Sequence, residues 1–126
     1  MKVTGYFDHC NINVTNLERS IAFYNKALGL TECKRKAAPD GSFILVYLTD
    51  PNKNFRLELT WLKDHPQSYE LGENESHICF RVAENYEAVH QYHQEMGCIC
   101  FENTAMGLYF INAPDDYWLE ILPVNH

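Results

Sequence analysis

Two stretches of the chain place apolar side chains three and four residues apart, which is the period of an amphipathic helix. The first runs from about Leu17 to Leu28 and follows the capping-box pattern Thr15-Asn16-Leu17-Glu18, with Thr15 as the expected N-cap. The second runs from about Asn85 to Met96. Gly29 and Gly97 come directly after these stretches, where a left-handed C-terminal cap is expected. The pattern therefore predicts two helices.

Around these helices, apolar and polar residues alternate or form short apolar runs, as is typical of β-strands. Each expected helix is preceded by one such segment and followed by three. The expected strands are 7–14, 30–36, 42–49 and 55–61 in the first half, and 76–82, 98–102, 108–112 and 117–122 in the second. The order of elements is therefore βαβββ twice, with residues 63–75 as the connector.

This repeat predicts an α+β fold in which two βαβββ modules form a cupped, mostly antiparallel sheet. The modules cover about 1–62 and about 76–126. A length of 126 residues suits a single domain over 1–126, because it allows one hydrophobic core and is short for two independent ones. The hydrophobic content of 46% excludes a disordered chain.

Strand alternation separates the side chains of each strand into two faces. In the first and last strands of each module, one face is mainly apolar and suits a helix packed against it. The other face carries one potential metal ligand in each strand: His9, Glu58, His77 and Glu120. The spacing from His to Glu is 49 residues in the first module and 43 in the second. Any one of these residues alone would be read as an ordinary exposed strand residue.

Together, two imidazoles and two carboxylates at matched places of a repeat are a suitable ligand set for one divalent metal. This mixture of nitrogen and oxygen donors favours Ni, Co, Zn, Mn or Fe over Ca or Mg. The sequence therefore predicts a metalloenzyme built from a duplicated unit. His90 and His93 lie three residues apart on the second helix, but without a third donor we expect them at a solvated or half-buried helix edge.

The overall charge restricts the kinds of partner. A formal net charge of -7 argues against nucleic acid or an anionic membrane surface as the main partner. The five cysteines are an odd number, and the start of the chain reads directly into strand-like sequence rather than a signal peptide. We therefore expect reduced thiols, a cytoplasmic location and small molecules as partners.

The motifs around these residues resemble those of glyoxalase I (lactoylglutathione lyase), within the vicinal-oxygen-chelate superfamily. The resemblance covers nearly the whole chain. Its motifs are Asp8-His9, Leu17-Glu18-Arg19-Ser20-Ile21-Ala22-Phe23-Tyr24, Leu28-Gly29-Leu30, Leu57-Glu58-Leu59-Thr60, Tyr69-Glu70-Leu71-Gly72, His77-Ile78 and Pro114-Asp115-Asp116-Tyr117-Trp118-Leu119-Glu120-Ile121.

The resemblance implies that His9, Glu58, His77 and Glu120 bind the metal, with Ni or Co favoured and Zn a further candidate. It implies isomerisation of the hemithioacetal of methylglyoxal and a thiol to an S-lactoyl thioester, through an enediolate. A metal-bound carboxylate would move the proton, and we assign this role to Glu120, with Glu58 as the alternative. Both one-chain and two-chain sites occur in the family. We expect a homodimer.

Positions that usually contact glutathione in such enzymes differ here. Asn13 stands where a basic residue is typical, and Leu62 stands where an Asn is typical. We therefore expect the thiol to be either glutathione or another low-molecular-weight thiol. The polar residues on the ligand-bearing face are our candidate substrate contacts: Asn11, Asn13, Arg56 and Arg81.

Other activities of the same superfamily compete with this interpretation. The nearest is a metal-dependent epimerase of the methylmalonyl-CoA type, which usually carries Gln at the position of Glu58. Thiol transferases of the fosfomycin-resistance type and ring-cleaving dioxygenases typically use three ligands instead of four. A binding module like the bleomycin-resistance proteins is a different class, and it typically lacks the metal set.

Overall fold

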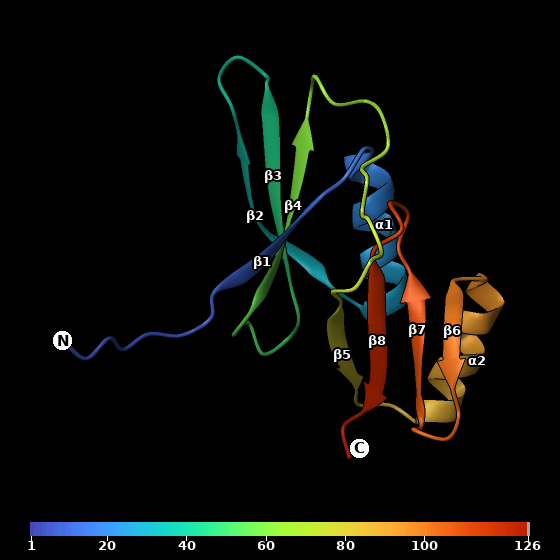
Figure 1. The fold of residues 1–126 in the computed structure, drawn as a ribbon. Helices are drawn as coiled ribbons and strands as arrows, with labels where there is room; N and C mark the ends of the chain where they lie inside the picture. The colour runs from blue at the N-terminus through green and yellow to red at the C-terminus, as the bar shows by residue number, and fades with distance from the viewer. Residues whose placement is uncertain (126) are drawn as a thin grey trace. The chain divides into compact units, whose positions relative to one another are not determined.

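The N-terminal half of the chain forms a four-stranded sheet and one helix in a computed structural model, which describes residues 1–125 (Figure 1). The sheet has the order β1-β4-β3-β2, with β1 and β4 parallel and the other neighbours antiparallel. Its elements in chain order are β1 (His9–Asn13), α1 (Leu17–Leu28), β2 (Thr31–Ala37), β3 (Phe43–Thr49) and β4 (Arg56–Leu62).

The C-terminal half repeats this plan. Its sheet has the order β5-β8-β7-β6, again with the first two strands in this order, β5 and β8, parallel and the other neighbours antiparallel. The elements are β5 (Ile78–Val82), α2 (Tyr86–Met96), β6 (Ile99–Asn103), β7 (Leu108–Asn112) and β8 (Trp118–Pro123). The predicted α+β class, with βαβββ twice and mostly antiparallel pairing, is confirmed.

Both helices begin and end with local capping interactions. Asn16 is the N-cap of α1, and its side chain accepts a hydrogen bond from the backbone N–H of Arg19. The expectation that Thr15 fills this position was wrong by one residue, because Asn is an equally good N-cap and lies directly before the first helical residue. Gly29 and Gly97 adopt φ of 68° and 71°, a left-handed conformation that glycine adopts without steric cost.

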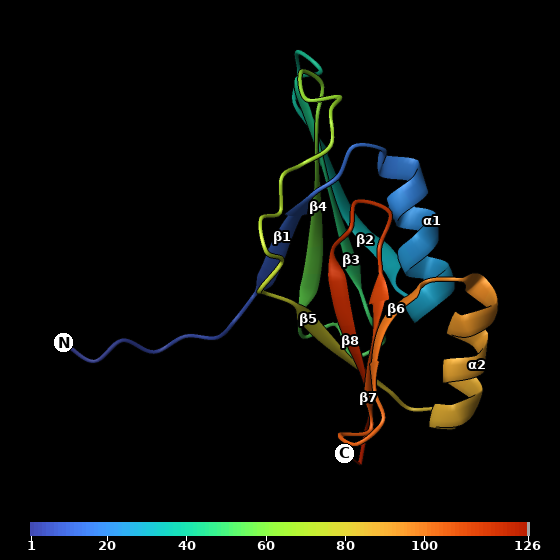
Figure 2. The same cartoon turned by 45° about the vertical axis from the view of Figure 1, so that its right-hand side comes forward.

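Each helix packs on one face of its own sheet (Figure 2). In the first half, that face and the helix bury Val46, Leu48, Leu59 and Tyr24, each at most 1% exposed. In the second half, the Tyr86 hydroxyl of α2 donates a hydrogen bond to the carbonyl of Ile121 in β8, whose side chain is fully buried. The face with the candidate ligands is therefore the other face, as the alternation of residues predicts.

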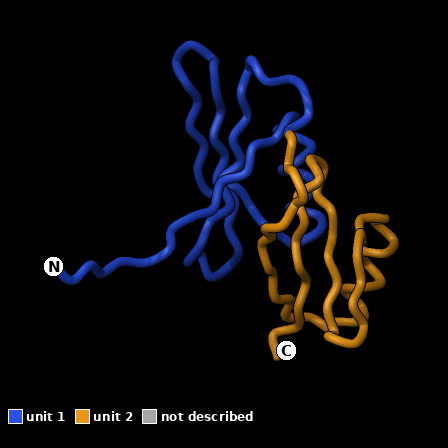
Figure 3. Tube along the Cα trace, viewed as in Figure 1, with its two compact units in different colours: residues 1–69 blue, residues 70–126 orange. Residues whose placement is uncertain are grey.

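The chain divides into two compact units, Met1–Tyr69 and Glu70–His126 (Figure 3). The boundary between them lies inside the expected connector, residues 63–75. We call them unit 1 and unit 2 and describe each by itself. Among the described residues, no helix is both long and apolar enough to cross a membrane.

Candidate metal and substrate site

In unit 1, His9 and Glu58 lie beside each other on the two parallel strands. Asn11 of β1 pairs with Glu58 of β4 in the strand register, and His9 is two residues before Asn11 on the same face. The His9 Nε2 atom lies 3.8 Å from Oε1 of Glu58. The Glu58 side chain is 12% exposed, and that of His9 is 37% exposed. The sheet therefore brings two donors from residues 49 positions apart to one accessible place.

Unit 2 forms the same pair. Cys79 of β5 pairs with Glu120 of β8, and His77 is two residues before Cys79. The His77 Nε2 atom lies 3.4 Å from Oε1 of Glu120. The side chains are 42% and 16% exposed, so here too the carboxylate is the more buried partner. The matched positions predicted from the repeat thus give matched pairs in space.

An aromatic ring on the third strand of each unit contacts the histidine. Tyr47 of β3 pairs with Glu58 in the register, and its ring meets that of His9 edge to face, with centroids 5.6 Å apart. Phe110 of β7 pairs with Glu120 and meets the His77 ring in the same way at 5.0 Å. Our sequence analysis missed both rings. The repeat carries a signal for them, because Tyr47 and Phe110 match each other when the two modules are aligned through their third strands.

The His9 pair lies among charged groups. Asp8 accepts a hydrogen bond from Nδ1 of His9 at 2.7 Å, in the tautomer that donates from this atom, and it also forms an ion pair with Arg56. These contacts, first His9 and then Arg56, hold the pKa of the Asp8 carboxyl below its usual value. The hydrogen bond of the Tyr47 hydroxyl to Glu58, together with burial, raises the pKa of Tyr47.

The His77 pair lies among apolar and weakly polar groups. Phe110, Trp118 and Phe101 form an aromatic cluster with ring centroids 5.5–6.3 Å apart. The Cys79 thiol lies against Glu120. Burial, and after it the neighbouring Glu120 carboxylate, raises the pKa of this thiol to about 11, so it stays protonated at neutral pH. Within the described residues, none of the five cysteines forms a disulfide.

The candidate substrate contacts have various partners. Asn11 accepts a hydrogen bond from the Thr60 hydroxyl and donates one to Asn13 at 3.0 Å, which forms a polar row beside Glu58. Arg56 is held by Asp8, as described above. Arg81 donates a hydrogen bond to the carbonyl of Pro123 at 2.9 Å, at the end of β8. In unit 1, three of the four candidates therefore lie on the face of the His9–Glu58 pair.

The geometry of each pair is compatible with a shared metal ion. Two donor atoms about 2.1 Å from one metal and at right angles to each other lie about 3 Å apart, which is close to the separations in the two pairs. The Asp8 contact leaves Nε2 of His9 available as a ligand, the arrangement usual for metal-binding histidines. Within either unit, the described residues contain no group of three or more His, Cys, Asp or Glu side chains that could hold a metal. Each pair thus offers two donors.

The two histidines on α2, His90 and His93, make structural contacts. The Nε2 atom of His90, which is half-buried as expected, pairs with Glu102. His93 is fully buried and shares a hydrogen bond of 2.8 Å with the Tyr109 hydroxyl. The expectation of a solvated or half-buried edge was therefore wrong for His93. His93 lies on the buried side of α2, and the Tyr109 hydroxyl is the hydrogen-bond partner that its ring nitrogen needs there.

Comparisons with known proteins identify the family of this chain. Residues 6–121 match the Glyoxalase/Bleomycin resistance protein/Dioxygenase superfamily, and the chain belongs to this superfamily. It is 32% identical over 121 residues to lactoylglutathione lyase of Neisseria meningitidis serogroup A, covering 90% of this chain and 87% of that protein. It is 28% identical to a probable lactoylglutathione lyase of Synechocystis, covering 93% and 94%.

Among solved structures, the chain is similar to the trypanothione-dependent glyoxalase I of Leishmania major. The TM-score is 0.85 at 27% identity, covering 97% of this chain and 88% of that one. Relatives and structural neighbours together identify the chain as an enzyme of the lyase class with a glyoxalase I-type fold. The predicted family is confirmed.

Proposed function

We propose that this chain is a metal-dependent glyoxalase I. It would isomerise the hemithioacetal of methylglyoxal and a low-molecular-weight thiol to the S-lactoyl thioester, through an enediolate. The observation that carries this proposal is the presence of two matched His–Glu pairs, one in each unit, at the same place of a repeated sheet. The lactoylglutathione lyases among its relatives support the same reaction.

In this proposal, four side chains bind one divalent metal: His9, Glu58, His77 and Glu120. Glyoxalase I enzymes are metal dependent as a family. The donor set favours a transition metal, with Ni or Co first and Zn a further candidate. When bound, the metal would acidify the substrate C–H bond and stabilise the negative charge that develops on the substrate oxygens.

The proton transfer itself needs a carboxylate. Glu120 would remove the proton from one carbon of the hemithioacetal and return it to the neighbouring carbon, so that no proton is gained or lost overall. Glu58 is the alternative base. The Tyr47 phenol, which is bonded to Glu58, is a stronger hydrogen-bond donor than the Cys79 thiol, which lies beside Glu120. The lone pairs of the Glu58 carboxylate are therefore bound more firmly than those of the Glu120 carboxylate. This difference supports Glu120 as the base.

The thiol is glutathione or another low-molecular-weight thiol. Asn11, Asn13 and Arg56, on the face of the His9–Glu58 pair, are proposed to contact the substrate, as is Arg81. The Leishmania major neighbour is described as trypanothione-dependent, so a similar fold is associated with a thiol other than glutathione. We further propose a homodimer located in the cytoplasm.

The test is reconstitution of metal-free protein. Ni, Co or Zn is added in turn, and thioester formation from methylglyoxal and glutathione is followed by ultraviolet absorbance. Activity should return with at least one metal and should stay low in Glu120→Gln. The control variant is Glu95→Gln, which changes an exposed carboxylate on α2 and should behave like the unmodified protein.

Two results would contradict the proposal. Failure to bind any of the three metals would remove its basis. Tight metal binding without activity, with glutathione or with other low-molecular-weight thiols, would instead favour the epimerase interpretation.

A further inference from the structure

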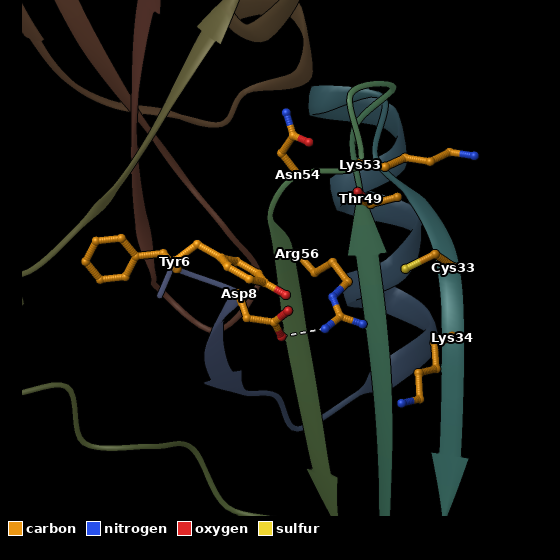
Figure 4. Close-up of a pocket in the computed structure, with 9 residues that line it drawn as sticks. Tyr6, Asp8, Cys33, Lys34, Thr49, Lys53, Asn54 and Arg56 are labelled. Carbon is orange, nitrogen blue, oxygen red and sulfur yellow. Dashed lines mark hydrogen bonds and ion pairs between the residues drawn. The ribbon is translucent and has the colours of Figure 1, made fainter. Parts of the chain in front are cut away.

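A pocket of about 860 Å³ opens in unit 1 (Figure 4). Two of its lining residues are neighbours of His9, since Asp8 is bonded to it and Arg56 pairs with it in the strand register. It lies where the parallel strands β1 and β4 begin, and parts of β2, β3 and the loop between β3 and β4 complete it. The pocket is lined by Tyr6, Phe7, Asp8, Cys33, Lys34, Thr49, Lys53, Asn54 and Arg56. None of these residues is among the proposed metal ligands.

The pocket concentrates positive charge in an acidic protein. Lys34, Lys53 and Arg56 supply three cations, whereas Asp8 is the single carboxylate in its lining. The whole chain, in contrast, has a net charge of -7. Asp8 is already bonded to His9 and Arg56, and within residues 1–125 neither lysine forms an ion pair. Positive charge therefore remains available to a ligand.

Two of these cations contact the same aromatic ring, that of Tyr47. The guanidinium carbon of Arg56 lies 4.9 Å from the centroid of this ring, and Nζ of Lys34 lies 5.5 Å from it. Contacts of this kind orient a cation over an aromatic face. The same ring meets His9 edge to face, so the cations are adjacent to a proposed metal ligand. Lys53 lies in the loop at the rim of the pocket (Figure 4).

The position of the pocket differs from that of the usual thiol contacts. Asn13 and Leu62 occupy those positions, and they are the last residues of β1 and β4. Because these strands are parallel, Arg56, the first residue of β4, is at the opposite end of the same face, and Asp8 is bonded to it there. Neutral side chains therefore stand at the end where a basic thiol contact is typical, and cations gather at the other end.

We propose that this pocket binds a carboxylate group of the substrate, with Lys34, Lys53 and Arg56 as its cationic contacts. The inference rests on the proposed function for the identity of the substrate, since the carboxylate belongs to one half of the hemithioacetal. With methylglyoxal as the aldehyde, the carboxylate is on the thiol half, because methylglyoxal has none. A carboxylate on the aldehyde half would mean that an oxoacid aldehyde takes the place of methylglyoxal. Charge-assisted hydrogen bonds from ammonium and guanidinium groups to carboxylates are stronger than those between neutral groups, and they give the pocket its selectivity for anions.

The experiment measures binding of unreactive thioethers by calorimetry, in the metal-loaded protein. S-methylglutathione and its diethyl ester differ in the carboxylates of the thiol half. S-(carboxymethyl)glutathione carries an additional carboxylate at the position of the aldehyde half. The test variant is Lys34→Gln/Lys53→Gln. The control variant, Lys36→Gln/Lys63→Gln, makes the same change of charge at two exposed lysines of unit 1 outside the pocket.

Two pairs are compared: S-methylglutathione with its diethyl ester, and S-(carboxymethyl)glutathione with S-methylglutathione. In one pair, the test variant should weaken binding of the compound that has the additional carboxylate about three- to tenfold relative to the other compound. The effect should decrease at high salt. The pair that responds identifies the half of the substrate that carries the carboxylate. An equal loss in the control variant, or no selective loss with either pair, would overturn the inference.

This measurement does not need turnover. Selective loss of binding in a protein without glyoxalase activity would support the pocket and contradict the proposed function. Glyoxalase activity of the protein, combined with unchanged binding in the test variant, would support the proposed function and contradict the pocket.

Discussion

The two units present the same donors in different surroundings. Each has a histidine at the start of an edge strand and a glutamate on the parallel neighbouring strand, with an aromatic ring from the third strand against the imidazole. In unit 1, the neighbours of this pair are Asp8, Arg56 and the Tyr47 hydroxyl. In unit 2, they are the aromatic cluster of Phe101, Phe110 and Trp118, and the Cys79 thiol.

This comparison separates what the repeated scaffold determines from what individual side chains add. The order and register of the strands determine where the two donors lie, and both are the same in the two sheets. The residues next to the donors determine the polarity around them. We therefore expect unit 1 to interact with charged parts of the substrate and unit 2 to offer an apolar surface.

The largest expected effect distinguishes the two carboxylates. Glu120→Gln should lower kcat on the order of 10²–10⁴-fold, because it removes the proposed base for the proton transfer. Glu58→Gln should lower kcat less and weaken metal binding. The measurement is kcat and metal content of both variants under the same conditions. The reverse order of the two kcat values would assign the base to Glu58.

The next effect tests whether the two units unfold together. Leu59→Ala in unit 1 and Ile121→Ala in unit 2 each remove a fully buried side chain and should each cost about 2–5 kcal/mol of unfolding free energy. If the chain is one cooperative domain, both variants shift a single denaturant transition. Two separate transitions, each sensitive to one variant, would show that the units are independently stable domains.

A smaller effect tests the carboxylate that contacts His9. Asp8→Asn should weaken metal binding about 10–100-fold, because Asp8 orients the imidazole through Nδ1. Within residues 1–125, no carboxylate is bonded to Nδ1 of His77. The control is Asp40→Asn, which changes an exposed turn aspartate bonded to Ser42. Metal titration by calorimetry compares them, and equal affinities would exclude this role for Asp8.

The smallest effect concerns a polar contact in the core of unit 2. Burial raises the pKa of Tyr109, whose side chain is 1% exposed and shares a hydrogen bond with His93. The folded protein therefore keeps the phenol proton at pH values where the unfolded chain loses it. Stability from this group is complete below the usual phenol pKa of about 10, and above it decreases by up to about 1.4 kcal/mol per pH unit.

Tyr109→Phe should accordingly cost about 1 kcal/mol at neutral pH, through the lost hydrogen bond, and flatten the decrease of stability above pH ~10. Denaturant unfolding at several pH values measures both effects. Tyr6→Phe, which changes a phenol that is 87% exposed, should leave the pH profile unaltered. An unchanged alkaline slope in Tyr109→Phe would contradict the assignment.

Most of the secondary structure follows from local patterns in the sequence. The helix α1 has the predicted bounds, Leu17–Leu28, and β7 has the predicted bounds, Leu108–Asn112. The other strands differ at their ends by one or two residues, because strand ends depend on pairing partners. The β-bulges at Cys33 and Cys100 were not predicted, since they are defined by a neighbouring strand.

The sequence by itself determined the βαβββ repeat, the two faces of each strand and the identity of four candidate donors. These features depend on periodicity, capping and residue type, which act over a few residues. Only the tertiary structure decided that β1 lies parallel to β4 and β5 parallel to β8, which brings each histidine to its glutamate. It also placed Asp8, Tyr47, Lys34 and Arg56 around one pair, because strand register and side-chain packing arise from contacts between distant parts of the chain.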